Sequence, residues 1–108
     1  MKLITKEIAK RLPALYTNEG KQPSEVQVIV KFFNPMGAGT WYITEGNLED
    51  GTLFGLCDLG MGYPELGYVT LQELEGLRLP MGLSIERDLH LPEGFTLADA
   101  MERVGMTV

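Results

Sequence analysis

The stretch Val-Gln-Val-Ile-Val-Lys-Phe-Phe, residues 26–33, decides the fold class of this chain. β-branched and aromatic side chains dominate it, and every second residue from Val26 to Phe32 is apolar and falls on one face, as in a strand. A turn with two glycines follows, and Thr40–Glu45 then repeats the same composition. We therefore predict that these two segments begin an antiparallel sheet.

Two further segments extend this sheet. Leu53–Asp58 and Glu65–Val69 read as a third and a fourth strand, and the polar residues 46–51 predict a hairpin connection in front of the third. Gly55 and Gly67 fall inside these strands. A glycine there marks a bulge, a close approach of another backbone, or room for an aromatic neighbour.

Three helices are predicted from their caps. Thr5 can cap a first helix, which Pro13 should end near residues 11–12. Thr70 and Glu73 match a capping box and open a short helix that runs to about residue 77. Thr96 caps the last helix, and a glycine at position 105 is placed to end it.

The ten residues Gly82–Leu91 alternate as a strand would. One face is apolar except for Arg87 at its centre, and the other is polar and carries the only histidine of the chain. A charge among apolar neighbours costs free energy unless it is paired. Glu45 is the acidic counterpart, because it shares a strand face with Trp41 and Ile43. We therefore predict a partly buried ion pair between Arg87 and Glu45, with a cleft in which Arg87 binds an anionic group as the alternative.

Length and composition are those of one globular domain. The chain has 108 residues, of which 44% are hydrophobic and 22% are charged. We predict an α+β fold over residues 1–108: a mainly antiparallel sheet of four to five strands with an N-terminal helix, a short middle helix and a C-terminal helix. No apolar run approaches the roughly 20 residues that span a bilayer, and Cys57 has no second cysteine to pair with. We expect a cytoplasmic protein without a membrane partner.

The charge is unevenly distributed. The net charge is −6, and residues 45–108 hold three arginines against twelve acidic residues, whereas residues 1–44 hold six basic and three acidic ones. Affinity for nucleic-acid phosphates needs clustered Lys and Arg, so this acidity argues against direct nucleic-acid binding and permits a protein partner with a basic surface. The simpler explanation, which we favour, is that the acidity keeps a small domain soluble.

The candidate site residues divide into two groups. Glu86, Asp88 and His90 alternate on the polar face of the Gly82–Leu91 strand, where they could bind a divalent metal or act as acid and base, although a solvated sheet face looks the same. Aromatic side chains such as Trp41 and Tyr68 could lie at a protein interface or in the core. No phosphate-binding loop is present, and we expect no cofactor.

Four segments in order resemble a small domain family catalogued only as being of unknown function. They are Trp41–Gly46, Leu53–Leu56, Glu65–Tyr68 and Gly82–Asp88. The family is carried on conjugative plasmids, phages and integrated elements, so the resemblance implies a mobile-element setting, often near anti-restriction or DNA-processing genes. It supplies no established catalytic residues.

Our first hypothesis is a non-enzymatic accessory protein of a mobile genetic element that binds another protein. Inhibition of a host defence, of anti-CRISPR or anti-restriction type, is one concrete form. The binding candidates are Arg87, Glu45, Trp41, Tyr68, Glu86 and Asp88. A small enzyme or metal-binding domain built on Glu86, Asp88 and His90, with Cys57 as a further candidate, is the second hypothesis. A DNA-associated module that uses the basic N-terminal segment, with Lys2, Lys6, Lys10 and Arg11, is the third.

Overall fold

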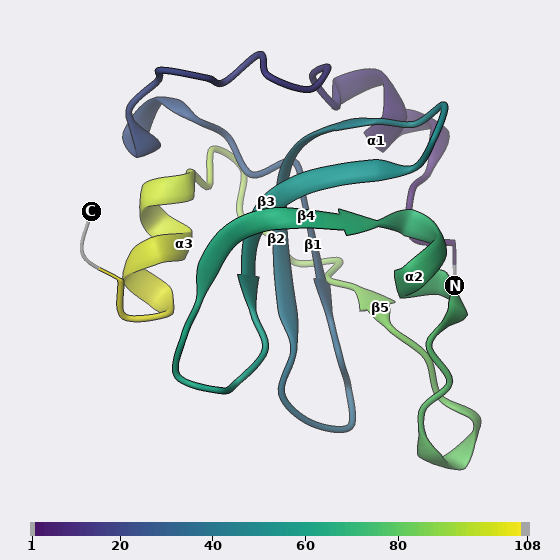
Figure 1. Cartoon of the computed structure of the whole chain (residues 1–108). Helices are drawn as coiled ribbons and strands as arrows, with labels where there is room; N and C mark the ends of the chain where they lie inside the picture. Colours follow the sequence, from purple (N-terminus) through teal and green to yellow (C-terminus); the bar gives the residue numbers. More distant parts are fainter. Residues whose placement is uncertain (1, 107–108) are drawn as a thin grey trace.

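The computed structural model describes residues 2–106 and contains one five-stranded antiparallel sheet (Figure 1). The order of the strands is β4-β3-β2-β1-β5. Their bounds are Val30–Phe33 for β1, Thr40–Asn47 for β2, Thr52–Asp58 for β3, Glu65–Thr70 for β4 and Glu86–Arg87 for β5. The predicted α+β class with its antiparallel sheet is confirmed.

The helices are short and begin at the predicted caps. They are α1 (Lys6–Arg11), α2 (Leu71–Gly76) and α3 (Leu97–Arg103), with 3₁₀ turns at Pro23–Glu25 and Pro80–Gly82. The Ile8 N–H donates to the Thr5 hydroxyl at 3.2 Å, and capping boxes open both α2 and α3. Each cap satisfies a backbone N–H that has no partner inside its own helix. No helix among residues 2–106 has the length and hydrophobicity that crossing a bilayer requires.

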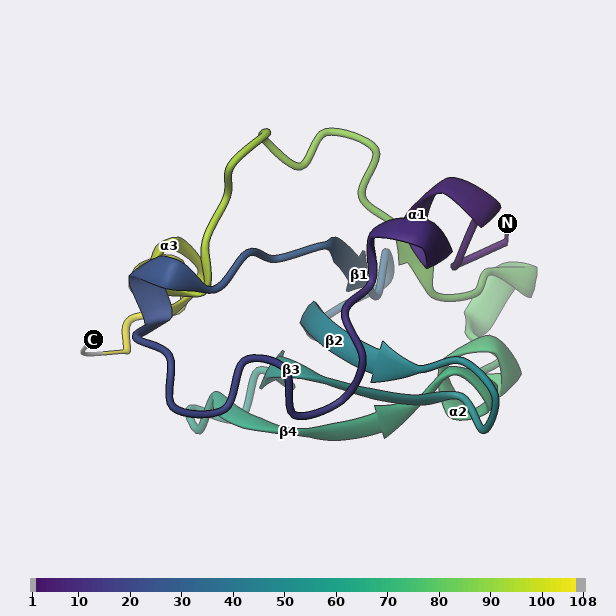
Figure 2. The same cartoon turned by 90° about the horizontal axis from the view of Figure 1, so that it is seen from above.

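The sheet carries a hydrophobic core on each face. Phe32, Trp41 and Ile43 belong to one core, which α1, α2 and the segment before α1 complete. Tyr42 and Leu56 belong to the other, which α3 and its neighbouring segments complete. Figure 2 shows α3 at one end of the sheet and α1 and α2 at the other. Because α3 covers only one end, part of the second face remains open beside it.

A β-bulge in β2 changes the face on which Glu45 lies. The register between β2 and β3 shifts between Ile43 and Glu45, so that Ile43 is opposite Gly55 and Glu45 is opposite Phe54. An extra residue in one strand reverses the alternation beyond it. Glu45 therefore lies on the face of Phe54 and Leu56, and the predicted sharing of a face with Trp41 and Ile43 is wrong.

Gly55 permits this bulge. A Cβ atom at this position would overlap the carbonyl oxygen of Tyr42 on the neighbouring strand. The expectation that a glycine here marks a bulge and a close backbone approach is confirmed. Gly67 differs, because a Cβ there would meet nothing within 4 Å.

The predicted strand over Gly82–Leu91 is wrong in length. Only Glu86 and Arg87 pair with β1, opposite Phe33 and Phe32, and the Asp88 N–H adds one bond to the Lys31 carbonyl. The segment before α3 occupies the next part of that edge: the Val28 N–H donates to the Phe95 carbonyl. Residues 26–29, predicted as part of the same strand, precede β1, and among them Gln27 forms an isolated bridge with Thr96.

Candidate functional site

Glu45 holds the turn that follows α1. The residue is 4% exposed, and its carboxylate accepts hydrogen bonds from the backbone N–H groups of Tyr16 and Asn18, the latter at 3.1 Å. The Asn18 side chain also donates to the Thr44 carbonyl at 3.4 Å. A buried carboxylate needs such donors. Glu45 thus joins the bulge of β2 to a loop almost thirty residues earlier in the chain.

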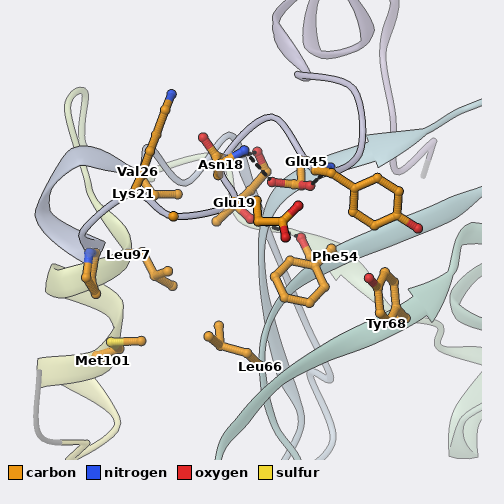
Figure 3. A pocket seen from close by; sticks show the side chains of 14 residues that line it. Asn18, Glu19, Lys21, Val26, Glu45, Phe54, Leu66, Tyr68, Leu97 and Met101 are labelled. Carbon is orange, nitrogen blue, oxygen red and sulfur yellow. Dashed lines mark hydrogen bonds between the residues drawn. The ribbon is translucent and has the colours of Figure 1, made fainter.

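This loop forms one wall of a groove of about 580 Å³. The open face of β3 and β4 and one side of α3 form the rest. In Figure 3, Glu19 and Glu45 lie at one end above Phe54 and Tyr68, and Leu97 and Met101 face them from the other side. The groove is therefore apolar along its length and carries carboxylates at one end.

Large apolar side chains line this groove without being buried. Tyr16 is 63% exposed, Leu66 43% and Tyr68 58%. Tyr68 packs against Phe54 with ring centroids 4.9 Å apart. Tyr16 has a φ of 72°, an uncommon backbone conformation for a non-glycine residue, and the bond from its N–H to Glu45 helps to hold it.

Carboxylates lie near the Tyr68 phenol at this end of the groove. Partial desolvation raises the pKa of the Tyr68 phenol, and the neighbouring phenol of Tyr16 raises it further. The carboxylates of Glu45 and Glu19 act in the same direction on that pKa. The Lys21 side chain extends away from the two carboxylates (Figure 3), and no ion pair with either is formed within residues 2–106.

Arg87 and Glu45 do not form the predicted ion pair. β1 lies between their strands, and the bulge has moved Glu45 to the other face. The Arg87 guanidinium instead donates to the backbone carbonyls of Lys2 and Leu3, the latter at 3.3 Å. It lines a second hollow of about 930 Å³ beneath residues 88–94, where acidic side chains also lie. Arg87 thus fastens the segment before α1 to β5.

Two other candidates are placed away from the groove. Trp41 is 7% exposed and belongs to the core on the opposite face, so its ring contributes to stability and not to a surface. The Cys57 thiol is partly buried; burial raises its pKa, and Glu65 raises it further. The neutral thiol is a poor nucleophile.

Glu86, Asp88 and His90 are not brought together as a metal site. The strand ends at Arg87, and the described part of the chain contains no group of three His, Cys, Asp or Glu side chains that could hold a metal ion. Asp88 instead faces Lys31 at 3.4 Å and accepts from the His90 backbone N–H at 2.7 Å. Its carboxylate ties β5 and the segment after it to β1.

Two of the groove residues, Glu45 and Tyr68, are among the candidates predicted from the sequence. Tyr16, Glu19 and Leu66 are not. No local pattern marks Tyr16 or Glu19, because the turn that places them is held by a residue distant in sequence. The sequence does indicate Leu66, because in an alternating strand it shares one face with Tyr68. The other face carries Glu65, Gly67 and Val69. Both apolar residues on one face of an outer strand indicate an uncovered surface.

Together these features define a small α+β domain with a groove on one sheet face, which is apolar along its length and acidic at one end. The chain belongs to the family described as a protein of unknown function (DUF2958), whose family model matches residues 3–106. No curated protein and no solved structure matches it.

Proposed function

We propose that this domain is a non-enzymatic accessory protein of a mobile genetic element that acts by binding another protein through the groove. Inhibition of a host defence system, of anti-CRISPR or anti-restriction type, is the form of action that we favour. The mobile-element setting rests on the resemblance of the strand motifs. The binding role rests on the surface of the groove.

The observation that carries the binding role is the clustering of exposed Tyr16, Leu66 and Tyr68 around one groove. Tyrosine is enriched at the energetically important centres of protein interfaces, since its ring buries a large area and its hydroxyl accommodates water. Contiguous exposed apolar side chains are costly to keep in water and commonly mark an interaction surface.

The charge of the chain favours a partner with a basic surface. The groove end with Glu19 and Glu45 is acidic, and so is the chain as a whole. Opposite charges on the two surfaces speed the encounter, whereas like charges repel unsuitable partners. The acidic groove end would therefore repel nucleic acid. The partner is therefore a protein, which docks a basic and apolar surface at the groove.

The test compares two tyrosines on the same molecule. Tyr68 lies in the groove, whereas Tyr63 is 83% exposed and lies outside it. The Tyr68→Ala and Tyr63→Ala proteins, expressed in native host cells, are affinity-purified and their co-purifying proteins identified by mass spectrometry. We expect a partner that is recovered with the wild type and with Tyr63→Ala, and is strongly depleted with Tyr68→Ala.

Salt gives a second readout of the same complex. Attraction between the acidic groove end and a basic partner weakens as added salt screens it, so the recovered amount should fall with ionic strength. Equal recovery with both variants, or recovery that salt does not change, contradicts the proposal.

A further inference from the structure

The outer edge of β4 is an open strand edge. β4 is the last strand on its side of the sheet, whereas β5 covers part of the opposite edge. Open edges expose backbone N–H and C=O groups that can pair with another chain. Natural edge strands are commonly blocked by a lysine, a proline or a bulge. β4 has none of these between Glu65 and Thr70.

The register identifies which backbone groups face outward. The Leu71 N–H donates to the Gly51 carbonyl at 2.8 Å, and this pair continues the register in which Thr70 is opposite Thr52. Hydrogen-bonded and non-hydrogen-bonded pairs alternate along an antiparallel ladder. The backbones of Gly67 and Val69 therefore face β3, and those of Leu66 and Tyr68 face away from it.

These outward groups have no partner inside the protein. Within residues 2–106, no backbone or side-chain group hydrogen-bonds to the N–H or C=O of Leu66 or Tyr68. Their side chains lie on the face of the groove. The same two residues thus offer four backbone hydrogen-bonding groups at the edge and two apolar side chains beside it.

We infer that β4 accepts an extended segment of the protein partner as a sixth strand, and that apolar and basic side chains alternate along this segment. The inference rests on the proposed function and adds how the partner binds. Backbone bonds to Leu66 and Tyr68 hold the segment, as in other cases of strand addition. Each second side chain of the segment then lies over the groove face.

Charge complementarity selects the basic side chains. A lysine or arginine beside Tyr68 can lie over its phenol and reach toward Glu19, whose carboxylate makes no hydrogen bond or ion pair within the described residues. Cations bind favourably over tyrosine rings. A second copy of this chain would bring its own net charge of −6 to the same edge, which disfavours self-pairing.

The experiment uses a phage-displayed library of random peptides, selected on the purified protein. Binding of the enriched peptides is measured by fluorescence anisotropy to the wild type and to the Leu66→Ala, Leu66→Pro and Tyr68→Ala proteins. Both Leu66 variants lose the side chain, but only proline also removes the outward N–H, and it leaves the bonds to β3 intact. We expect enriched peptides with alternating apolar and basic residues, and affinity for Leu66→Pro about tenfold below that for Leu66→Ala.

Amide hydrogen exchange of the wild type tests the edge without any substitution. We expect the amides of Leu66 and Tyr68 to exchange quickly in the free protein and to become protected when an enriched peptide binds. The amides of Gly67 and Val69 should be protected in both states, because they already bond to β3.

The outcomes separate the two proposals. If Tyr68→Ala weakens peptide binding while Leu66→Pro equals Leu66→Ala and the two edge amides stay unprotected, the strand addition is wrong and the groove remains the docking site. Enrichment of acidic peptides also overturns it, as does a dimer in analytical ultracentrifugation that Leu66→Pro dissociates. A library that yields no peptide sensitive to Tyr68→Ala contradicts both.

Discussion

The carboxylate of Glu45 connects the sheet to the wall of the groove. It is buried, and the N–H groups of Tyr16 and Asn18 both donate to it. Bonds from N–H groups to a charged acceptor are stronger than those between neutral groups. The position of the loop, and with it the exposed Tyr16 ring, therefore depends on one side chain.

Replacing this carboxylate should loosen the loop. Glu45→Gln keeps the size of the side chain, but one of the two backbone N–H donors then meets the side-chain NH2 group, which cannot accept a hydrogen bond. We therefore expect a loss of about 1–3 kcal/mol in the free energy of unfolding. Urea denaturation measures it. Glu49→Gln, in the exposed turn after β2, is the control and should change that free energy by less than about 0.5 kcal/mol. Equal effects of the two substitutions would contradict the role of Glu45.

The two strand glycines give a second prediction. Gly55→Ala places a methyl group against the Tyr42 carbonyl, and relief requires the bulge to shift, so we expect a loss of about 3 kcal/mol or more, or failure to fold. Gly67→Ala, with open space around its Cβ, should stay within about 1 kcal/mol of the wild type. Urea denaturation measures the free energy of unfolding of both variants. A Gly55→Ala protein as stable as the wild type would show that the bulge does not need this glycine.

At the scale of the elements, β5 is held by few bonds. It pairs over two residues, and the Lys31 ammonium lies 3.4 Å from the Asp88 carboxylate just beyond them. Burial alone raises the pKa of Asp88, but the His90 N–H and the Lys31 ammonium outweigh it and hold the pKa below its usual value. The ionised carboxylate thus stabilises this end of the sheet.

The pH dependence of this contribution has a definite sign. A carboxyl group whose pKa is lower in the folded state than in the unfolded state stabilises the protein fully when the pH is above the unfolded-state pKa of about 3.9. This contribution disappears as the pH falls through the folded-state pKa. Asp88→Asn should therefore cost up to about 1 kcal/mol at neutral pH. The difference from wild type should vanish at acidic pH. Urea denaturation across this range measures it, and a difference that persists in acid would contradict the assignment.

The sequence predicted those elements whose signals are local. Thr5, Thr70 and Thr96 cap helices through residues three positions later, so the pattern needs no knowledge of the fold. The predicted strand at Gly82–Leu91 is too long, because β1 ends at Phe33, opposite Glu86, and the residues before Glu86 have no strand to pair with in the described part of the chain. Alternation alone carries no such information.

The candidate site could be predicted only in part, because the positions of its residues depend on contacts between segments that are distant in the sequence. The placement of Glu45 in the groove depends on the bulge opposite Gly55, which reverses the strand face and separates Glu45 from Arg87. The sequence indicates a possible bulge at Gly55, but its effect on Glu45 follows only from the register between β2 and β3. Tyr16 depends on a backbone conformation that its sequence neighbours do not announce.

At the scale of the whole molecule, the sheet is covered unequally. One face is closed by α1, α2 and the segment before α1, whereas α3 closes only one end of the other. The uncovered part lies over β3 and β4 and carries Leu66 and Tyr68. We propose that a protein partner fills it and so completes the burial that the chain itself leaves unfinished.

Site-specific photo-cross-linking in native host cells shows whether a protein partner occupies the groove. A benzophenone amino acid is placed at position 68 in the groove or at position 63 outside it, and adducts are identified by mass spectrometry after irradiation. We expect a specific protein adduct from position 68 that is absent from position 63. The same adduct from both positions, or none from position 68, would contradict the proposal.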